Sequence, residues 1–203
     1  MVANSVQQYI RAGVAGFHIE DQVQTKRCGH LKGKKVVDAA TFLSRIRAAV
    51  GAKNKLKSDI VIIARTDALQ TLGYQECINR LKAARDLGAD VGLLEGYTSK
   101  EMARLAVIDL APWPLLLNMV ENGATPVITV DEARDFGFKI MIFSFAALAP
   151  AYTAIRNTFE RLKTEGVVGT GKDLTPLKLF EICGLNESMK LDFDAGGLDF
   201  TEV

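Results

Sequence analysis

The residues best suited to chemistry are concentrated at positions 18–30, where carboxylates, cations and a thiol follow one another. Glu20 and Asp21 come first. Two carboxylates at the end of a strand can serve a hard divalent cation, because Mg²⁺ prefers oxygen ligands and keeps several waters. The other interpretation of the same spacing is a solvated acidic loop.

Cys28 comes a few residues later, preceded by Lys26 and Arg27 and followed by His30. Cationic neighbours favour the thiolate and lower the pKa of a cysteine, so this thiol is predicted to serve as an acid or base near neutral pH. A buried, inert thiol is the alternative. The polar sequence around Cys28 favours the functional interpretation.

Further polar residues occur at regular intervals along the chain. Arg65 could clamp a carboxylate through two parallel hydrogen bonds. A structural ion pair of Arg65 with Glu20 or Glu95 is compatible with that role, and Glu95 is expected to orient the arginine. Asn118 could donate to a substrate oxygen, whereas Gly123 is expected to shape its loop. Together these residues predict a site for a small polyanionic substrate and a metal.

Each polar group comes just after a short apolar run. The runs are at 14–19, 60–64, 91–94, 114–117 and 140–143, and the residues that follow them are Glu20, Arg65, Glu95, Asn118 and Ser144. Runs this short and this apolar are typical of parallel strands that are covered on both faces.

Helical patterns separate the predicted strands. Residues 40–50 place Phe42, Ile46 and Ala49 on one face, 74–87 end at a glycine, and 131–136 begin with an acidic turn. Such alternation predicts βα units, in either an open doubly wound sheet or a closed barrel. The lack of a GxGxxG or P-loop motif and the polar residue after every strand favour a (β/α)8 barrel (TIM barrel).

Five strands are too few for a complete barrel, which has eight and about 250 residues. The chain opens in a predicted helix at 2–12, and a helix at 150–165 is followed by a glycine-containing loop and a short tail. We therefore predict one partial barrel domain over 1–203, with about five of eight βα units and a helical tail from about 150. About three units are expected to be absent from the front.

The composition excludes several classes of protein. The chain has 203 residues, with 25 Lys+Arg against 24 Asp+Glu and a formal charge of +1, which argues against binding to nucleic acid. The apolar runs are far shorter than the roughly 20 residues of a membrane helix, and no signal-peptide pattern is present. Three widely spaced cysteines suit reduced thiols in a cytoplasmic protein, with Cys77 and Cys183 expected to pack.

The residues 26–30, Lys-Arg-Cys-Gly-His, resemble the K-[KR]-C-G-H signature of the isocitrate lyase and phosphoenolpyruvate mutase superfamily. Supporting matches follow in the family's order, at 18–22 (HIEDQ), 64–68 (ARTDA), 118–121 (NMVE) and 123–126 (GATP). The resemblance implies a (β/α)8 barrel that cleaves carbon–carbon bonds and forms homo-oligomers, usually tetramers, by exchanging a C-terminal helix.

The resemblance also implies roles for individual residues. Glu20 would belong to a Mg²⁺ (or Mn²⁺) site, and Cys28 would be the general acid that protonates the enolate left by bond cleavage. Lys26 and His30 would act with Cys28 in the catalytic loop. The residues expected to bind a small dicarboxylate or 2-oxo acid are Arg65, Glu95, Asn118, Ser144, Arg27 and Gly29.

Ser144 indicates a branch of the family. Many relatives have proline there, whereas the oxaloacetate hydrolases are the branch with serine, whose hydroxyl can hydrogen-bond the hydrated ketone. A buried serine that caps its own backbone is the alternative. The resemblance therefore implies hydrolysis of oxaloacetate to oxalate and acetate, with 2-methylisocitrate or 2,3-dimethylmalate cleavage as the near alternative.

The chain departs from the family at its front. The family's D-x-D-T-G-Y-G-G stretch and its Ser/Gly carboxylate-binding loop do not occur here. The direct metal ligands are thus expected to be missing, and Glu20 alone cannot hold Mg²⁺ tightly. Two hypotheses follow: a partial sequence whose full-length form is the enzyme, or an inactive 203-residue product that acts as a pseudoenzyme or interaction partner.

Overall fold

The computed structural model describes residues 1–26, 28 and 30–197. The chain divides into two compact units, Met1–Ala146 and Ala147–Val203, the second corresponding to the helical tail expected from about 150. The prediction that the whole chain forms one domain stays a prediction. Within the described residues, no helix is long and apolar enough to cross a membrane.

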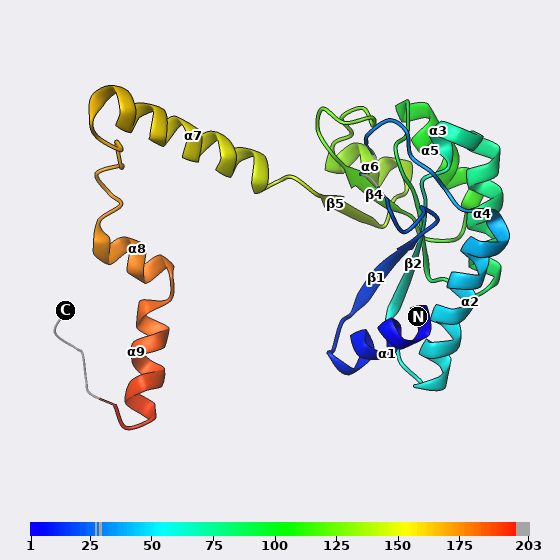
Figure 1. The fold of residues 1–203 in the computed structure, drawn as a ribbon, viewed down its shortest axis with the longest axis horizontal. Helices are drawn as coiled ribbons and strands as arrows, with labels where there is room; N and C mark the ends of the chain where they lie inside the picture. Colours follow the sequence, from blue (N-terminus) through cyan, green and yellow to red (C-terminus); the bar gives the residue numbers. More distant parts are fainter. Residues whose placement is uncertain (27, 29, 198–203) are drawn as a thin grey trace. The chain divides into compact units, whose positions relative to one another are not determined.

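In its described residues, the first unit contains five parallel strands in chain order (Figure 1). They are β1 (Gly16–Glu20), β2 (Val61–Thr66), β3 (Val91–Leu94), β4 (Leu116–Met119) and β5 (Ile140–Phe143). All five predicted strands are confirmed. However, β1, β2 and β4 reach beyond the apolar runs to include Glu20, Arg65 and Asn118, because ladder pairing involves the backbone and not the side chain.

The strands β1, β2 and β3 form one sheet and β4 and β5 another, joined by a parallel bridge between Gly92 and Leu115. A Cβ atom on Gly92 would lie 2.4 Å from the Trp113 ring, so only glycine permits this close approach. In the described part of the chain β1 pairs only with β2, and β5 only with β4. This arrangement is the predicted partial (β/α)8 barrel, with five consecutive strands of the barrel in sequence order.

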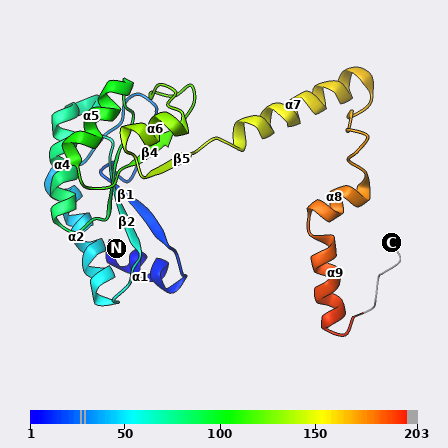
Figure 2. The same cartoon turned by 180° about the vertical axis from the view of Figure 1, so that it is seen from behind.

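Helices cover one face of these strands, and Figures 1 and 2 show α2 and α4 running side by side along them. The helices of this unit are α1 (Val2–Arg11), α2 (Ala39–Lys55), α3 (Leu69–Leu72), α4 (Tyr74–Asp86), α5 (Lys100–Leu110) and α6 (Val130–Phe136). The predicted face of α2 is confirmed, since Phe42, Ile46 and Ala49 are buried. The sequence analysis did not single out α5, although Ser99 caps it by accepting from the Met102 N–H.

The core lies on both faces of the strands. The larger cluster fills the space between strands and helices and includes Ile62 and Ala64 of β2. A smaller cluster lies on the opposite face, formed by Ile63, Val91, Leu93 and Leu116 with Val61 and Ile142 packed against it. Side chains two positions apart on a strand share a face, so the residues that follow Ile63, Leu93 and Leu116 on this inner face are polar. They are Arg65, Glu95 and Asn118.

The second unit contains α7 (Leu148–Glu165), α8 (Pro176–Ile182) and α9 (Leu185–Asp194). The predicted helix at 150–165 is confirmed, and the helical tail expected from about 150 continues after a glycine-containing loop with two further helices over 176–194. Thr175 caps α8 in front of Pro176, a start signal that the sequence carried. Cys183 is exposed, so its predicted packing role is wrong, because this unit buries no side chain of its helices.

Candidate active site at the strand ends

Arg65 lies at the centre of the polar cluster on the inner face. Its Nε and Nη2 donate to the two oxygens of Asp67 at 2.8 and 2.9 Å. Its guanidinium also lies 3.4 Å from a carboxylate oxygen of Glu20 and of Glu95. Burial acts to lower the pKa of Arg65, but these carboxylates raise it above its usual value, so the group stays charged. The predicted ion pairs with Glu20 and Glu95 are confirmed.

Asp67 is the site residue that the sequence analysis missed. It is fully buried, and its Oδ1 also lies 3.4 Å from Nζ of the buried Lys34. Burial by itself would raise the pKa of Asp67, but the hydrogen bonds and charge of Arg65, together with Lys34, lower it overall. The Arg-x-Asp spacing in residues 65–67 was a usable signal, since residues two apart on a strand share a face.

Asn118 joins two further site residues. Its Nδ2 donates to both carboxylate oxygens of Glu95 at 3.2 Å, and its Oδ1 accepts from the Ser144 hydroxyl at 2.7 Å. Ser144 is exposed and bonded to a side chain, so the alternative of a buried serine capping its own backbone is not observed. Four strand ends thus contribute one connected polar network, from Ser144 through Asn118 and Glu95 to Arg65.

The loop 21–38, between β1 and α2, brings two basic residues to this network. Lys26 Nζ lies 3.1 Å from Glu20 Oε1, and His30 Nε2 lies 2.9 Å from Glu95 Oε1. The other ring nitrogen of His30 accepts from the Ala124 N–H at 3.0 Å, which places the proton of the neutral ring on Nε2, facing Glu95.

Gly123 permits the contact of His30 with the loop after β4. A Cβ atom at Gly123 would lie 2.5 Å from the Nδ1 of His30. Gly123 was expected to shape its loop, and the absence of its side chain also makes room for the imidazole of His30.

Cys28 lies in the same loop and is exposed, with its carbonyl accepting from the Leu31 N–H. Its predicted acid–base role stays a prediction. Arg27 and Gly29, predicted to bind substrate, lie outside the described residues. Cys77 is buried, and burial raises its pKa to about 12, which confirms a packing cysteine.

The carboxylate of Asp21 belongs to the scaffold and is not part of the inner-face cluster. It accepts from the Thr66 hydroxyl at 2.6 Å, from the Asp67 N–H at 2.8 Å and from Arg80 of α4 at 3.2 Å. Burial raises the pKa of Asp21 despite the hydrogen bonds from Asp67 and Thr66. The two carboxylates considered for a metal site therefore point to different faces, and of these two Glu20 lies on the inner face.

The residues present do not make a complete site for Mg²⁺ or Mn²⁺. Both oxygens of Glu20 face cations, Lys26 and Arg65. Among the residues that the structure describes, no group of three or more His, Cys, Asp or Glu side chains could hold a metal ion. A hard cation needs several oxygen ligands, so the ligands besides Glu20 would have to lie outside these residues.

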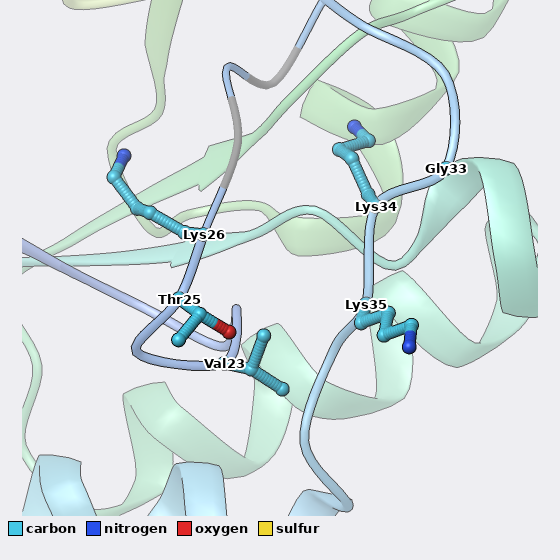
Figure 3. A pocket seen from close by; sticks show the side chains of 6 residues that line it. All are labelled: Val23, Thr25, Lys26, Gly33, Lys34 and Lys35. Carbon is cyan, nitrogen blue, oxygen red and sulfur yellow. The ribbon is translucent and has the colours of Figure 1, made fainter.

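A cavity of about 250 Å³ lies between the two limbs of the loop 21–38. It is lined by Val23, Thr25, Lys26, Gly33, Lys34 and Lys35 (Figure 3). The ammonium groups of its lysines do not converge on one point, and Lys34 and Lys35 point away from each other. The lysines give this cavity a positive charge, but their ammonium groups are not arranged to bind one anion.

Most of the chain matches a known protein family. The family described as phosphoenolpyruvate phosphomutase matches residues 1–163. The chain belongs to this family. Within the wider phosphoenolpyruvate mutase and isocitrate lyase superfamily, it is 40% identical over 165 residues to 2-methylisocitrate lyase of Escherichia coli strain K12, covering 81% of this chain and 55% of the relative. It is 35% identical over 173 residues to 2,3-dimethylmalate lyase of Eubacterium barkeri, covering 83% and 59%.

Solved structures of the superfamily share the fold closely. The structure of oxaloacetate acetylhydrolase in complex with the inhibitor 3,3-difluorooxalacetate has 66% identity and a TM-score of 0.94, covering 98% of this chain and 67% of that one. A structure of 2,3-dimethylmalate lyase has 62% identity and a TM-score of 0.94, covering 99% and 67%. These likenesses confirm the partial (β/α)8 barrel.

The chain spans 55–61% of the length of the 2-methylisocitrate lyases from Escherichia coli and Aeropyrum pernix. Magnesium and oxalate are present together in a solved complex of a more distant relative, phosphonopyruvate hydrolase, at 26% identity and a TM-score of 0.77 over 94% of this chain and 66% of that one.

Proposed function

We propose that this protein, at the full length of its solved relatives, is a cytoplasmic enzyme that hydrolyses oxaloacetate to oxalate and acetate. The observation that carries the proposal is the Ser144 hydroxyl, held by Asn118 at the inner face beside the Arg65 cluster. The 66% identity to a structure of oxaloacetate acetylhydrolase over nearly the whole chain supports it.

In this proposal Arg65 binds a substrate carboxylate. Asp67 occupies two of its N–H groups, which fixes the plane of the guanidinium and leaves the remaining donors for the substrate. Glu95 and Asn118 fix the neighbouring positions, so that the serine hydroxyl meets the hydrated ketone while Arg65 holds the carboxylate.

Cleavage then proceeds from the hydrated ketone at C2 of oxaloacetate. Loss of a hydroxyl proton re-forms the C=O bond as the C2–C3 bond breaks, and its electron pair passes to C3 as the acetate enolate. The thiol of Cys28 gives its proton to C3 and regains one from solvent. The two hydroxyl protons of the hydrated ketone pass to solvent, so oxaloacetate and water yield oxalate, acetate and one net proton. Lys26, Arg27 and His30 would help to close and polarise the loop over the substrate, and Arg27 and Gly29 would bind the substrate. No step is assigned to a divalent cation, because the described residues supply only Glu20 toward it.

Cleavage of 2,3-dimethylmalate or 2-methylisocitrate is the second candidate. Its support is the 62% identity to a structure of 2,3-dimethylmalate lyase and the 40% identity to the Escherichia coli 2-methylisocitrate lyase. Arg65, Glu95 and Asn118 serve either reaction, since both substrates are small polycarboxylates. Among the site residues that the structure describes, Ser144 is the one that discriminates between the two reactions.

A form extended to the length of the solved relatives tests this choice with a panel of oxaloacetate, 2,3-dimethylmalate and 2-methylisocitrate. We expect oxaloacetate to have the highest kcat/KM. The change Ser144→Pro, with Ser144→Ala as the milder variant, is expected to lower oxaloacetate turnover by about 10²-fold, the effect of losing one aligned donor. Ser188→Ala, in an exposed part of α9, is the matched control. Undiminished oxaloacetate turnover in both Ser144 variants would refute the substrate assignment.

For the 203-residue chain alone we propose that catalysis is absent and that α7–α9 join other subunits. Its support is the exposure of large apolar residues along these helices, including Tyr152, Ile155 and Phe159. Oxalate release above that of a Cys28→Ser control would contradict the inactivity, and a monomer at every concentration in sedimentation would contradict the assembly.

A further inference from the structure

Basic residues of the loop 21–38 contact the carboxylates of the Arg65 cluster. Three carboxylates surround the guanidinium of Arg65, and each of them also contacts one basic residue of the loop. The pairs are Glu20 with Lys26, Glu95 with His30, and Asp67 with Lys34. The loop is therefore fastened to the arginine at three points, of which the proposed function uses only the first two.

The third point differs from the others in burial. Lys26 is a half-exposed side chain, whereas both Lys34 and Asp67 have no exposed side-chain surface. A surface pair exchanges readily with water, but a buried pair that loses one partner leaves an uncompensated charge. Lys34 is thus suited to be a permanent attachment of the loop.

The surrounding backbone supports an anchor at this place. The two limbs of the loop pair at its base, where the Val23 N–H donates to the Lys35 carbonyl and the Val37 N–H donates to the Asp21 carbonyl. A bridge between Gln22 and Val36 lies between these bonds. Lys34 directly precedes this paired segment, and its ammonium group contacts Asp67 just after the end of β2.

We infer that Lys34 is a positioning residue, which anchors the returning limb of the loop to Asp67 and so keeps Arg65 aligned for a substrate carboxylate. The Asp67 carboxylate transmits the effect, because its Oδ1 faces Lys34 Nζ and accepts from Arg65 Nη2 at the same time. The alignment of Arg65 for substrate rests on the proposed function, but the anchoring of the loop does not.

Amide hydrogen exchange on the 203-residue chain tests the anchor without any substrate. In Lys34→Met we expect the Val23 and Val37 amides to exchange at least about 10-fold faster, as in local opening, with the Glu95 amide of the core unchanged. Lys34→Arg is expected to restore the slow rates. Lys35→Met is the matched control, because Lys35 is exposed and points away from Lys34 (Figure 3).

Two results of this measurement would overturn the inference. One is wild-type exchange of the loop amides in Lys34→Met. The other is equal acceleration of loop and core amides, which would make Lys34 a general stabilising residue. A variant that unfolds gives the second result.

Steady-state kinetics of the extended form test the alignment. We expect Lys34→Met to raise KM by about 10-fold with a smaller change in kcat, since ground-state carboxylate binding is lost, and Lys34→Arg to reverse it. Unchanged KM with an opened loop would refute the link to Arg65. If the wild-type extended form does not turn over oxaloacetate, the proposed function is refuted. Hydrogen exchange still tests whether Lys34 anchors the loop.

Discussion

Both compact units of this chain contain many apolar residues, but the first unit buries them in a core and the second leaves them exposed. Every buried residue that the structure describes lies in the first unit, where the helix-facing and inner clusters hold the strands. The helices of the second unit bury none. Apolar residues at helical spacing are therefore not sufficient for a core, because a stripe stabilises a helix only where another surface covers it.

The helix α7 illustrates this difference. Tyr152, Ile155, Phe159 and Leu162 follow the three- and four-residue spacing of one face, as Phe42, Ile46 and Ala49 do on α2. The residues of α2 face strands, whereas those of α7 are exposed. The predictions below test whether folding stability follows this division.

The largest difference is expected for phenylalanine truncation. Phe42→Ala, at a side chain with 0% exposure, should lower the free energy of unfolding by about 3–5 kcal/mol. Phe159→Ala, at 63% exposure, should change the unfolding of dilute protein by less than about 0.5 kcal/mol. Urea denaturation of both variants at low protein concentration is the measurement. Similar losses for the two would show that α7 shares the core of the first unit.

Ion pairs should show a smaller difference that depends on pH. Asp67→Asn should cost about 2 kcal/mol at pH 7, because charged hydrogen bonds to Arg65 are lost. The folded pKa of Asp67 is lowered, so this stabilisation is present above the usual aspartate value and is lost as pH falls through the folded pKa. The gap between wild type and variant should thus shrink below about pH 4.

The matched control for Asp67 is Asp194→Asn, at an exposed pair with Lys190 in α9. We expect no measurable change in unfolding at either pH, since exposed pairs contribute little. A constant cost of Asp67→Asn from pH 7 to pH 3 would contradict a charged, paired Asp67.

The smallest effect concerns two helix caps of the same residue type. Thr129 caps α6 with a capping box completed by Glu132, and Thr175 caps α8. Thr129→Ala should destabilise the cooperative unfolding of the first unit by about 1 kcal/mol. Thr175→Ala should leave that transition unchanged and lower only the helical signal in circular dichroism. Equal shifts of the transition would show that both units unfold together.

Much of the scaffold could be predicted from local pattern. The five strands, the buried face of α2 and the end of α6 at Gly137 follow from apolar periodicity and from glycine at a left-handed position. The tail was predicted to be helical, but the bounds of α8 and α9 within it could not be recognised by a buried face, because these helices have none. Cys183 was misjudged for the same reason.

The site was predicted in outline, because the carboxyl ends of parallel strands bring Glu20, Arg65, Glu95 and Asn118 to one edge. Its internal pairing was not. Asp67 and Lys34 are 33 positions apart and meet only when the loop 21–38 folds back on β2. Asp21 and Glu20 are neighbours in sequence, but alternation along the chain directs them to opposite faces.

The amino-acid sequence by itself determined the order of strands and helices, the residues at the strand ends and the family signature at 26–30, because these depend on residue type and short-range spacing. Only the tertiary structure decided which carboxylate contacts which cation, since burial and the return of a loop set those distances. It also decided that the apolar faces of α7–α9 remain uncovered, because a core requires two surfaces and the sequence of one helix specifies only one of them.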